Sequence, residues 1–228
     1  MQINVIASGS TGNCYLISDG KTKLMLECGI PFKKLQRAVG FGLSSIAGCL
    51  ITHEHKDHSR SASDLLHMGI NCYMPAGTAN ALNVSGYRVK TVAAGRQLQI
   101  ETFLIVPFTA QHDAAEPLSY LIYSTVTKER LVFVTDSYYV ANRLPPCGYY
   151  LIECNYIDEL VSESTPDALK ARLWTSHMSL KTTIAFFREQ NLVKCKSIYL
   201  IHLSNARSDA ERMKREVEAV TGKEVIIA

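Results

Sequence analysis

The sequence lacks several features that would place the protein in a special class. It contains no run of about 18 apolar residues, so no membrane-spanning helix and no membrane partner are expected. The first residues show no basic stretch followed by an apolar one, which argues against a signal peptide. Low-complexity tracts and repeats are also missing, and the net charge is only +3. Such a weak charge neither indicates nor excludes a nucleic-acid partner.

Cys-x-x-Cys pairs are absent as well, and the number of cysteines, seven, is odd. Most of them lie in apolar stretches, such as residues 48–51. We interpret them as buried free thiols in a reducing compartment and expect a cytoplasmic protein. A disulfide framework is the less favoured alternative.

The hydrophobic content, 47% of 228 residues, is enough for a sizeable core and predicts a single domain over 1–228. Periodicity predicts strands at 2–7, 13–18, 22–27, 49–52, 71–74, 89–93, 98–108, 118–124, 130–135, 149–153, 197–202 and 224–227. Helices are predicted at 31–39, 61–68, 76–82, 157–163, 166–173, 180–190 and 207–220. Strand-rich halves that each end in helices indicate an α/β fold, a four-layer αββα sandwich.

A glycine-rich stretch, Ser-Gly-Ser-Thr-Gly-Asn at 8–13, has the composition of a phosphate-binding loop. However, it lacks the Gly-Lys-Ser/Thr ending, and strands are predicted on both sides of it. We therefore predict a hairpin loop there.

The stretch ITHEHKDHS, residues 51–59, holds three of the seven histidines. Imidazole and carboxylate groups are ligands of zinc and of other borderline metals. The groups that it offers within six positions are His53, His55, Asp57 and His58. A solvated polar turn is the alternative, but such a turn would more typically contain lysine and glutamate. The stretch therefore predicts a metal site at the end of a strand.

Three more candidate ligands follow predicted strands: His112, Asp136 and His202. Each one alone is compatible with an ordinary polar residue at a strand end. Together with the histidine-rich stretch, they supply enough ligands for two metal ions. By contrast, His67 lies inside a predicted helix and is interpreted as structural.

This set of residues, in this order, resembles the metallo-β-lactamase superfamily. The resemblance implies an αββα fold and two divalent metal ions, zinc first and manganese as the alternative. It assigns His53, His55 and His112 to one ion, Asp57, His58 and His202 to the other, and Asp136 to both. Glu27 stands where the superfamily usually has an aspartate, and we expect it to orient the site without binding metal.

A second resemblance concerns Ser176-His177-Met178-Ser179, which precedes the stretch 201–204. It is similar to the His-x-Ser element of transfer-RNA 3′-processing ribonucleases of the tRNase Z type, which implies that His177 assists the leaving group. A helix-start residue without chemistry is the alternative. The stretches 7–14 and 152–156 resemble WalJ/YycJ-type bacterial proteins. Phage anti-Pycsar enzymes, which degrade cyclic mononucleotides, share the general design.

These resemblances imply a phosphodiesterase that uses a hydroxide bridging two metal ions, with Asp57 orienting or deprotonating the nucleophile and His177 donating a proton. A 3′,5′-cyclic mononucleotide is slightly favoured as substrate, because the chain is compact and weakly charged. A single-stranded DNA or RNA nuclease is the near-equal alternative, with stacking by tyrosines near Arg143. A thioesterase or lactonase and a non-enzymatic scaffold are less favoured. The resemblance also suggests a homodimer.

Overall fold

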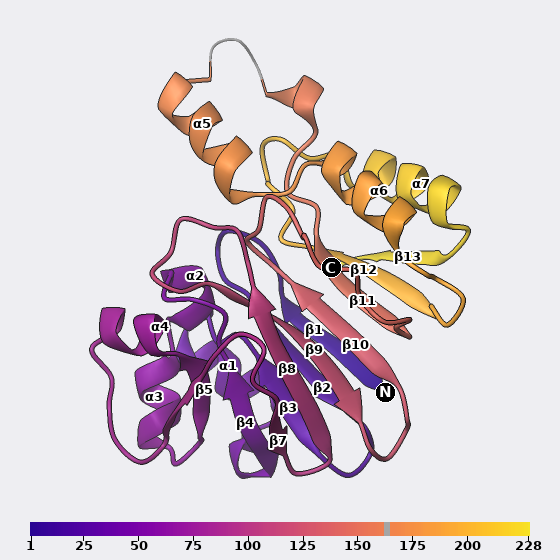
Figure 1. The fold of residues 1–228 in the computed structure, drawn as a ribbon. Helices are drawn as coiled ribbons and strands as arrows, with labels where there is room; N and C mark the ends of the chain where they lie inside the picture. Colours follow the sequence, from indigo (N-terminus) through magenta and orange to yellow (C-terminus); the bar gives the residue numbers. More distant parts are fainter. Residues whose placement is uncertain (162–164) are drawn as a thin grey trace. The chain divides into compact units, whose positions relative to one another are not determined.

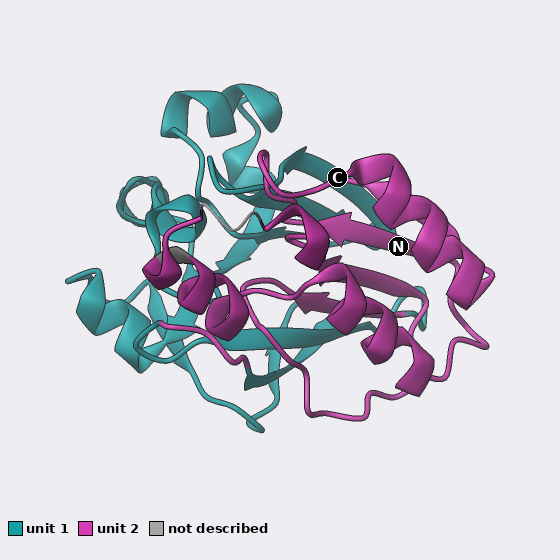
Figure 2. Cartoon of the chain, turned by 90° about the horizontal axis from the view of Figure 1, so that it is seen from above, with its two compact units in different colours: residues 1–109, 114–129 teal, residues 110–113, 130–228 magenta. Residues whose placement is uncertain are grey.

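A computed structural model describes residues 1–161 and 165–228 of the chain. The chain divides into two compact units, shown in teal and magenta in Figure 2. Unit 1 comprises Met1–Thr109 and Ala114–Glu129, and unit 2 comprises Ala110–Asp113 and Arg130–Ala228. The single domain over 1–228 stays a prediction, because a division into compact units does not say whether each unit folds alone.

Unit 1 contains a six-stranded sheet whose strands follow the order of the chain. The strands are β1 (Gln2–Ala7), β2 (Cys14–Ser18), β3 (Lys23–Leu26), β4 (Ile46–Leu50), β5 (Cys72–Pro75) and β6 (Val89–Val92). The first three pair antiparallel, and β3 to β6 pair parallel. The expected hairpin loop at 8–13 is confirmed, since β1 pairs with β2 from Gln2 opposite Ser18 to Ala7 opposite Cys14.

Helices cover one face of this sheet (Figure 1). They are α1 (Phe32–Ala38), α2 (Lys56–Ser59), α3 (Ala62–His67) and α4 (Ala76–Ala81), with a 3₁₀ turn η1 (Leu43–Ser45). Leu35 of α1, Leu65 of α3 and Ala79 of α4 are buried in one cluster with Met25 and Cys49 of the sheet. The apolar faces of α1, α3 and α4 therefore pack on the strands, and these are the three helices of this unit that the sequence predicted.

Antiparallel strands of unit 1 form a second sheet layer: β7 (Leu98–Ile100), β8 (Phe103–Thr109) and β9 (Leu118–Ser124). The Tyr120 hydroxyl of β9 donates to the Ile51 carbonyl, just past β4, at 2.7 Å. The expected continuous strand over 98–108 is wrong. Glu101, with a φ of 50°, starts a two-residue turn that brings Ile100 opposite Phe103. The turn contains no glycine, proline or asparagine that would have announced it.

Unit 2 contains a parallel sheet of β10 (Arg130–Val134), β11 (Tyr149–Glu153), β12 (Ser197–Ile201) and β13 (Glu224–Ile227). Its helices are α5 (Asp167–Ser176), α6 (Leu180–Glu189) and α7 (Ala210–Thr221). In Figure 1, α6 and α7 lie side by side next to these strands. The helix expected at 157–163 is replaced by a 3₁₀ turn, η2 (Asp158–Leu160), while 162–164 lie outside the described residues.

All seven cysteines are buried and free, as expected. Burial raises the pKa of the Cys147 and Cys154 thiols to about 12, so both remain protonated near neutral pH and are weak nucleophiles. Within 1–161 and 165–228, no helix combines the length and the apolar character needed to cross a membrane. The cytoplasmic location stays a prediction.

Asp19 links the β2–β3 turn to the antiparallel strands of unit 1. One carboxylate oxygen accepts hydrogen bonds from the backbone amides of Lys21 and Thr22, at 3.0 and 2.8 Å. The other accepts from the hydroxyls of Thr102 and Ser124, at 2.6 and 2.8 Å. Burial by itself raises the pKa of Asp19, but these hydrogen bonds outweigh it and hold the pKa below its ordinary value. The charged form of Asp19 therefore stabilises unit 1.

We expect Asp19→Asn to lower the free energy of unfolding by about 1–3 kcal/mol at neutral pH, because an amide nitrogen cannot accept hydroxyl protons. A lowered folded pKa means that the stabilisation is present above the unfolded pKa of about 3.9 and is lost as the pH falls through the folded pKa. Urea unfolding at neutral pH and at about pH 3 measures both effects. Asp64→Asn, at an exposed carboxylate of α3, is the control. A deficit that does not shrink with falling pH would contradict the role of the charge.

Candidate functional site

The histidine-rich stretch of unit 1 lies directly after β4 and runs into the single turn of α2. His53 and His58 are buried, while His55 and Asp57 are half-buried. The ring centroid of His53 lies 4.6 Å from that of His55 and 4.2 Å from that of His58. An oxygen of Asp57 lies 3.4 Å from Nε2 of His58. The stretch therefore gathers three imidazoles and a carboxylate in a small volume.

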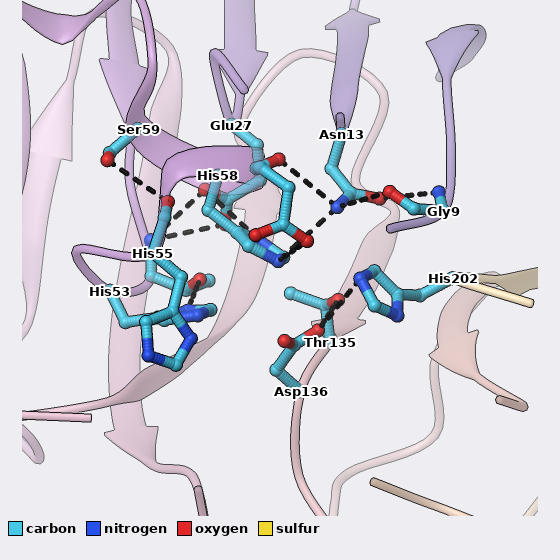
Figure 3. A network of polar contacts seen from close by, with 12 residues as sticks. Gly9, Asn13, Glu27, His53, His55, His58, Ser59, Thr135, Asp136 and His202 are labelled. Atoms are coloured by element: carbon cyan, nitrogen blue, oxygen red, sulfur yellow. Dashed lines mark hydrogen bonds and ion pairs between the residues drawn. The ribbon is translucent and has the colours of Figure 1, made fainter. Parts of the chain in front are cut away.

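Glu27, which follows β3, supports this cluster from the protein interior. Its side chain is fully buried and its φ is 60°, in the left-handed region. The carboxylate accepts a hydrogen bond from the Thr52 amide at 3.1 Å. It also lies 3.7 Å from Nδ1 of His58, and Figure 3 shows these two side chains facing each other. Burial raises the pKa of Glu27, and the contact with His58 opposes that rise. These contacts suit the expected orienting role of Glu27, which stays a prediction.

The loop at 8–13 and Gly29 hold the backbone of α2, a role that the sequence analysis missed. Asn13 donates its amide N–H to the Asp57 carbonyl at 2.7 Å, and its side-chain nitrogen lies 3.3 Å from Nε2 of His58 (Figure 3). A Cβ on Gly29 would lie 1.6 Å from that same Asp57 oxygen, so only glycine allows this approach. Glycines and an asparagine were the available signal, but they are typical of any hairpin loop.

We expect Gly29→Ala to displace the Asp57–His58 backbone and to lower the free energy of unfolding by about 1–3 kcal/mol, since no room exists for a Cβ. It should also weaken zinc binding. Gly148→Ala is the matched control, because a Cβ there meets nothing closer than 3.5 Å. Urea unfolding and zinc titration measure the two effects. A Gly29→Ala protein as stable as Gly148→Ala would contradict the close approach.

In unit 2, three neighbouring parallel strands end at polar residues. Glu153 is the last residue of β11, Asp136 lies two residues beyond β10, and His202 directly follows β12. The strand register brings these ends level with one another. The carboxyl ends of parallel strands are where open α/β sheets bind their ligands. Unit 2 therefore presents two carboxylates and an imidazole at one edge of its sheet.

Asp136 connects the predicted ligands of unit 2. One carboxylate oxygen lies 3.4 Å from Nε2 of His112, and the other lies 3.4 Å from Nε2 of His202. Nδ1 of His112 lies 2.9 Å from the Ser176 carbonyl, which fixes the orientation of the ring. Burial lowers the pKa of His112, so its neutral form, the one that binds metals, is favoured. Unit 2 thus brings His112, Asp136 and His202 together.

Glu153 is a second buried carboxylate, and the sequence analysis assigned no role to it. Oε1 lies 2.7 Å from Nδ1 of His177 and 3.4 Å from Nδ1 of His202, and Oε2 accepts from the Ser137 amide at 3.0 Å. Burial alone raises the pKa of Glu153, but the charge of His177 lowers it overall. For His177, burial by itself lowers the pKa, but the charge of Glu153 outweighs burial, so the pKa of His177 is raised overall. The sequence did contain one sign of this role, because Glu153, like Asp136, lies at the end of a predicted strand.

Both groups of side chains have donor sets that suit a divalent metal ion. In unit 2, Asp136 and His202 each offer one ligand atom, and these atoms lie within 4.8 Å of atoms of Glu153 and His177, two residues that already pair with each other at 2.7 Å. Nitrogen from imidazole and oxygen from carboxylate are ligands for zinc, and manganese also accepts oxygen donors. The chain can therefore bind metal.

Comparison with known proteins adds independent information. The family model described as Beta-lactamase superfamily domain matches residues 25–203. The exodeoxyribonuclease YycJ of Bacillus anthracis is 25% identical to this chain, with 96% of the chain and 89% of the relative covered. The exodeoxyribonuclease WalJ of Streptococcus pneumoniae serotype 2 is 29% identical, with 91% and 83% covered.

A solved structure supports the same assignment of the fold. The metallo-β-lactamase fold protein YhfI of Bacillus subtilis matches with a TM-score of 0.77 at 18% identity, and 99% of this chain and 95% of that chain are covered. The likeness shows the fold and confirms the expected α/β class of two sheets flanked by helices.

Proposed function

Because the chain belongs to the β-lactamase superfamily, we propose that it is a metal-dependent phosphodiesterase that cleaves single-stranded DNA. Membership of this family confirms the predicted resemblance and the predicted class of enzyme, a metal-dependent hydrolase. The observation that carries the DNA substrate is the similarity, over nearly the whole chain, to two relatives named as exodeoxyribonucleases. A cyclic mononucleotide, slightly favoured by the sequence, stays a prediction, as does a homodimer. A thioesterase or lactonase stays a less favoured alternative.

The predicted metal ligands fall into two sets that share one residue. Asp136 is shared; His53, His55 and His112 complete one set, and Asp57, His58 and His202 complete the other. This assignment follows from the order of the motifs, and the chemistry of the side chains supports it. Divalent ions bound there lower the pKa of water and offset the charge of a phosphate group. Zinc is the first expectation, and manganese is the second.

The side chains of the chain then supply orientation and protons. Asp57, which is half-buried, orients or deprotonates the nucleophile. His177 is partly exposed and carries a raised pKa, so it can donate a proton to the departing oxygen. Glu153 accepts the hydrogen bond from Nδ1 of His177 and leaves Nε2 to face the substrate.

One experiment tests this function against its alternatives. The protein, loaded with zinc or manganese, is incubated with a labelled single-stranded oligodeoxynucleotide and, separately, with 3′,5′-cyclic mononucleotides. Asp57→Ala serves as the blank. We expect the oligonucleotide to be shortened and the cyclic nucleotides to persist. Fast loss of the cyclic nucleotides with an intact oligonucleotide would replace the proposal by a phosphodiesterase for small nucleotides.

The leaving group reveals the role of His177. We expect His177→Ala to slow DNA cleavage about 100- to 10,000-fold, because an alkoxide leaving group needs a proton. The same variant should lose much less activity on bis(p-nitrophenyl) phosphate, since p-nitrophenolate leaves without one. Glu153→Gln should follow the same pattern, and the metal content of both variants should match the wild type. Equal losses on both substrates would contradict proton donation.

A further inference from the structure

Unit 2 contains a cavity of about 430 Å³ that none of the residues proposed for chemistry lines. One wall is the segment 139–143, and the other is a face of α6. The residues of this α6 face are Thr182, Ala185, Phe186 and Glu189, and Gln190, the C-cap of the helix, adjoins them. The volume lies within the range of pockets that hold small organic ligands.

Both walls of this cavity begin at the polar site of unit 2. The segment 139–143 follows Asp136 and Ser137, and α6 follows His177 and Met178. The amides of Ser137 and Met178 both donate to Oε2 of Glu153, at 3.0 and 3.4 Å. One buried carboxylate therefore fixes the start of both walls relative to His177.

The C-terminal end of the segment 139–143 is also fixed, and the cavity lies close to His177. The Leu144 amide donates to the side-chain oxygen of Gln190 at 3.3 Å, which ties the segment to the end of α6. With a rise of about 1.5 Å per residue, the cavity residues Thr182 to Phe186 lie about 5–10 Å along α6 from its N-cap, Ser179. The cavity therefore begins within a few residues of His177, the proposed proton donor.

The chemistry of the lining suits a nucleotide. Tyr139 is 54% exposed, so its ring is accessible for stacking, and Arg143 of the same wall is also exposed. Phe186 is buried and forms an apolar part of the opposite wall, while the Asn142 amide and the Glu189 carboxylate can bond to base edges. An aromatic ring together with a cation is the usual means of holding single-stranded nucleic acid.

We propose that this cavity binds one nucleotide of the single-stranded DNA substrate, with its base stacked on Tyr139 and its phosphate paired with Arg143. This inference rests on the proposed nuclease function and adds the position at which the strand is held.

The test separates strand binding from chemistry. Initial rates are measured against the concentration of a single-stranded oligodeoxynucleotide. In parallel, they are measured with bis(p-nitrophenyl) phosphate, which is too small to occupy both the cleavage site and the cavity. Tyr139→Ala should raise KM for the oligonucleotide about 5- to 150-fold, as expected for the loss of one stacked base. Tyr139→Phe keeps the ring and should remain close to the wild type. Tyr87→Ala removes a tyrosine that is 84% exposed and lines no part of this cavity, and it is the control.

The inference would be overturned by an unchanged KM in Tyr139→Ala, by an equal defect in Tyr139→Phe, or by an equal defect in Tyr87→Ala. An equal loss of Tyr139→Ala activity on bis(p-nitrophenyl) phosphate would do so too, because it would indicate damage to the site itself. A wild type that hydrolyses this small ester but leaves DNA intact would overturn the proposed nuclease function. Fluorescence anisotropy with a labelled oligonucleotide and the Asp57→Ala protein then decides separately whether removal of the Tyr139 ring weakens strand binding.

Discussion

Buried carboxylates impose the main physical constraint on both units of this protein. A carboxylate removed from water costs several kcal/mol unless hydrogen bonds and opposite charges compensate. Glu27 and Glu153 are both fully buried, and each lies at the end of a strand beneath a group of histidines. Each therefore requires donors, and the donors it uses belong to the loops that carry the site residues. The hydrogen bonds that compensate the buried carboxylates therefore also orient the functional side chains.

Backbone strain also occurs just beyond three of the strands that carry the site residues. Glu27, Asp136 and His202 all adopt a φ in the left-handed region, at 60°, 46° and 55°. For residues with a Cβ, such conformations cost on the order of 1–3 kcal/mol each and persist only where the surroundings determine them. In unit 2, the surroundings that hold these conformations are the aligned ends of β10, β11 and β12 and the buried Glu153. The strained positions turn the chain sharply, so that the side chains stay at the sheet edge instead of following the strand onward.

The cavity beside α6 bears on the choice between a small and a polymeric substrate. A net charge of +3 spread over the chain provides little attraction for a polyanion. A single exposed cation beside an exposed aromatic ring acts locally, so it does not need a strongly basic surface. Because Tyr139 and Arg143 follow Asp136 within a few residues, the proposed binding of the strand and the proposed chemistry would share one short segment of unit 2. A cyclic mononucleotide would have no second nucleotide to place there.

The sequence by itself determined the local features of this protein. Its periodicity was sufficient for nearly all helices and strands, and the crowded histidines of residues 53–58 announced a metal site because the ligands are adjacent in the chain. What only the tertiary structure decided depends on contacts between distant residues. The close approach of Gly29 to Asp57, the pairing of Glu153 with His177, and the turn at Glu101 all join segments by geometry that composition does not encode. A glutamate at a strand end is ordinary in sequence, and it becomes a determinant of the site only when folding removes it from water and leaves a histidine as its partner.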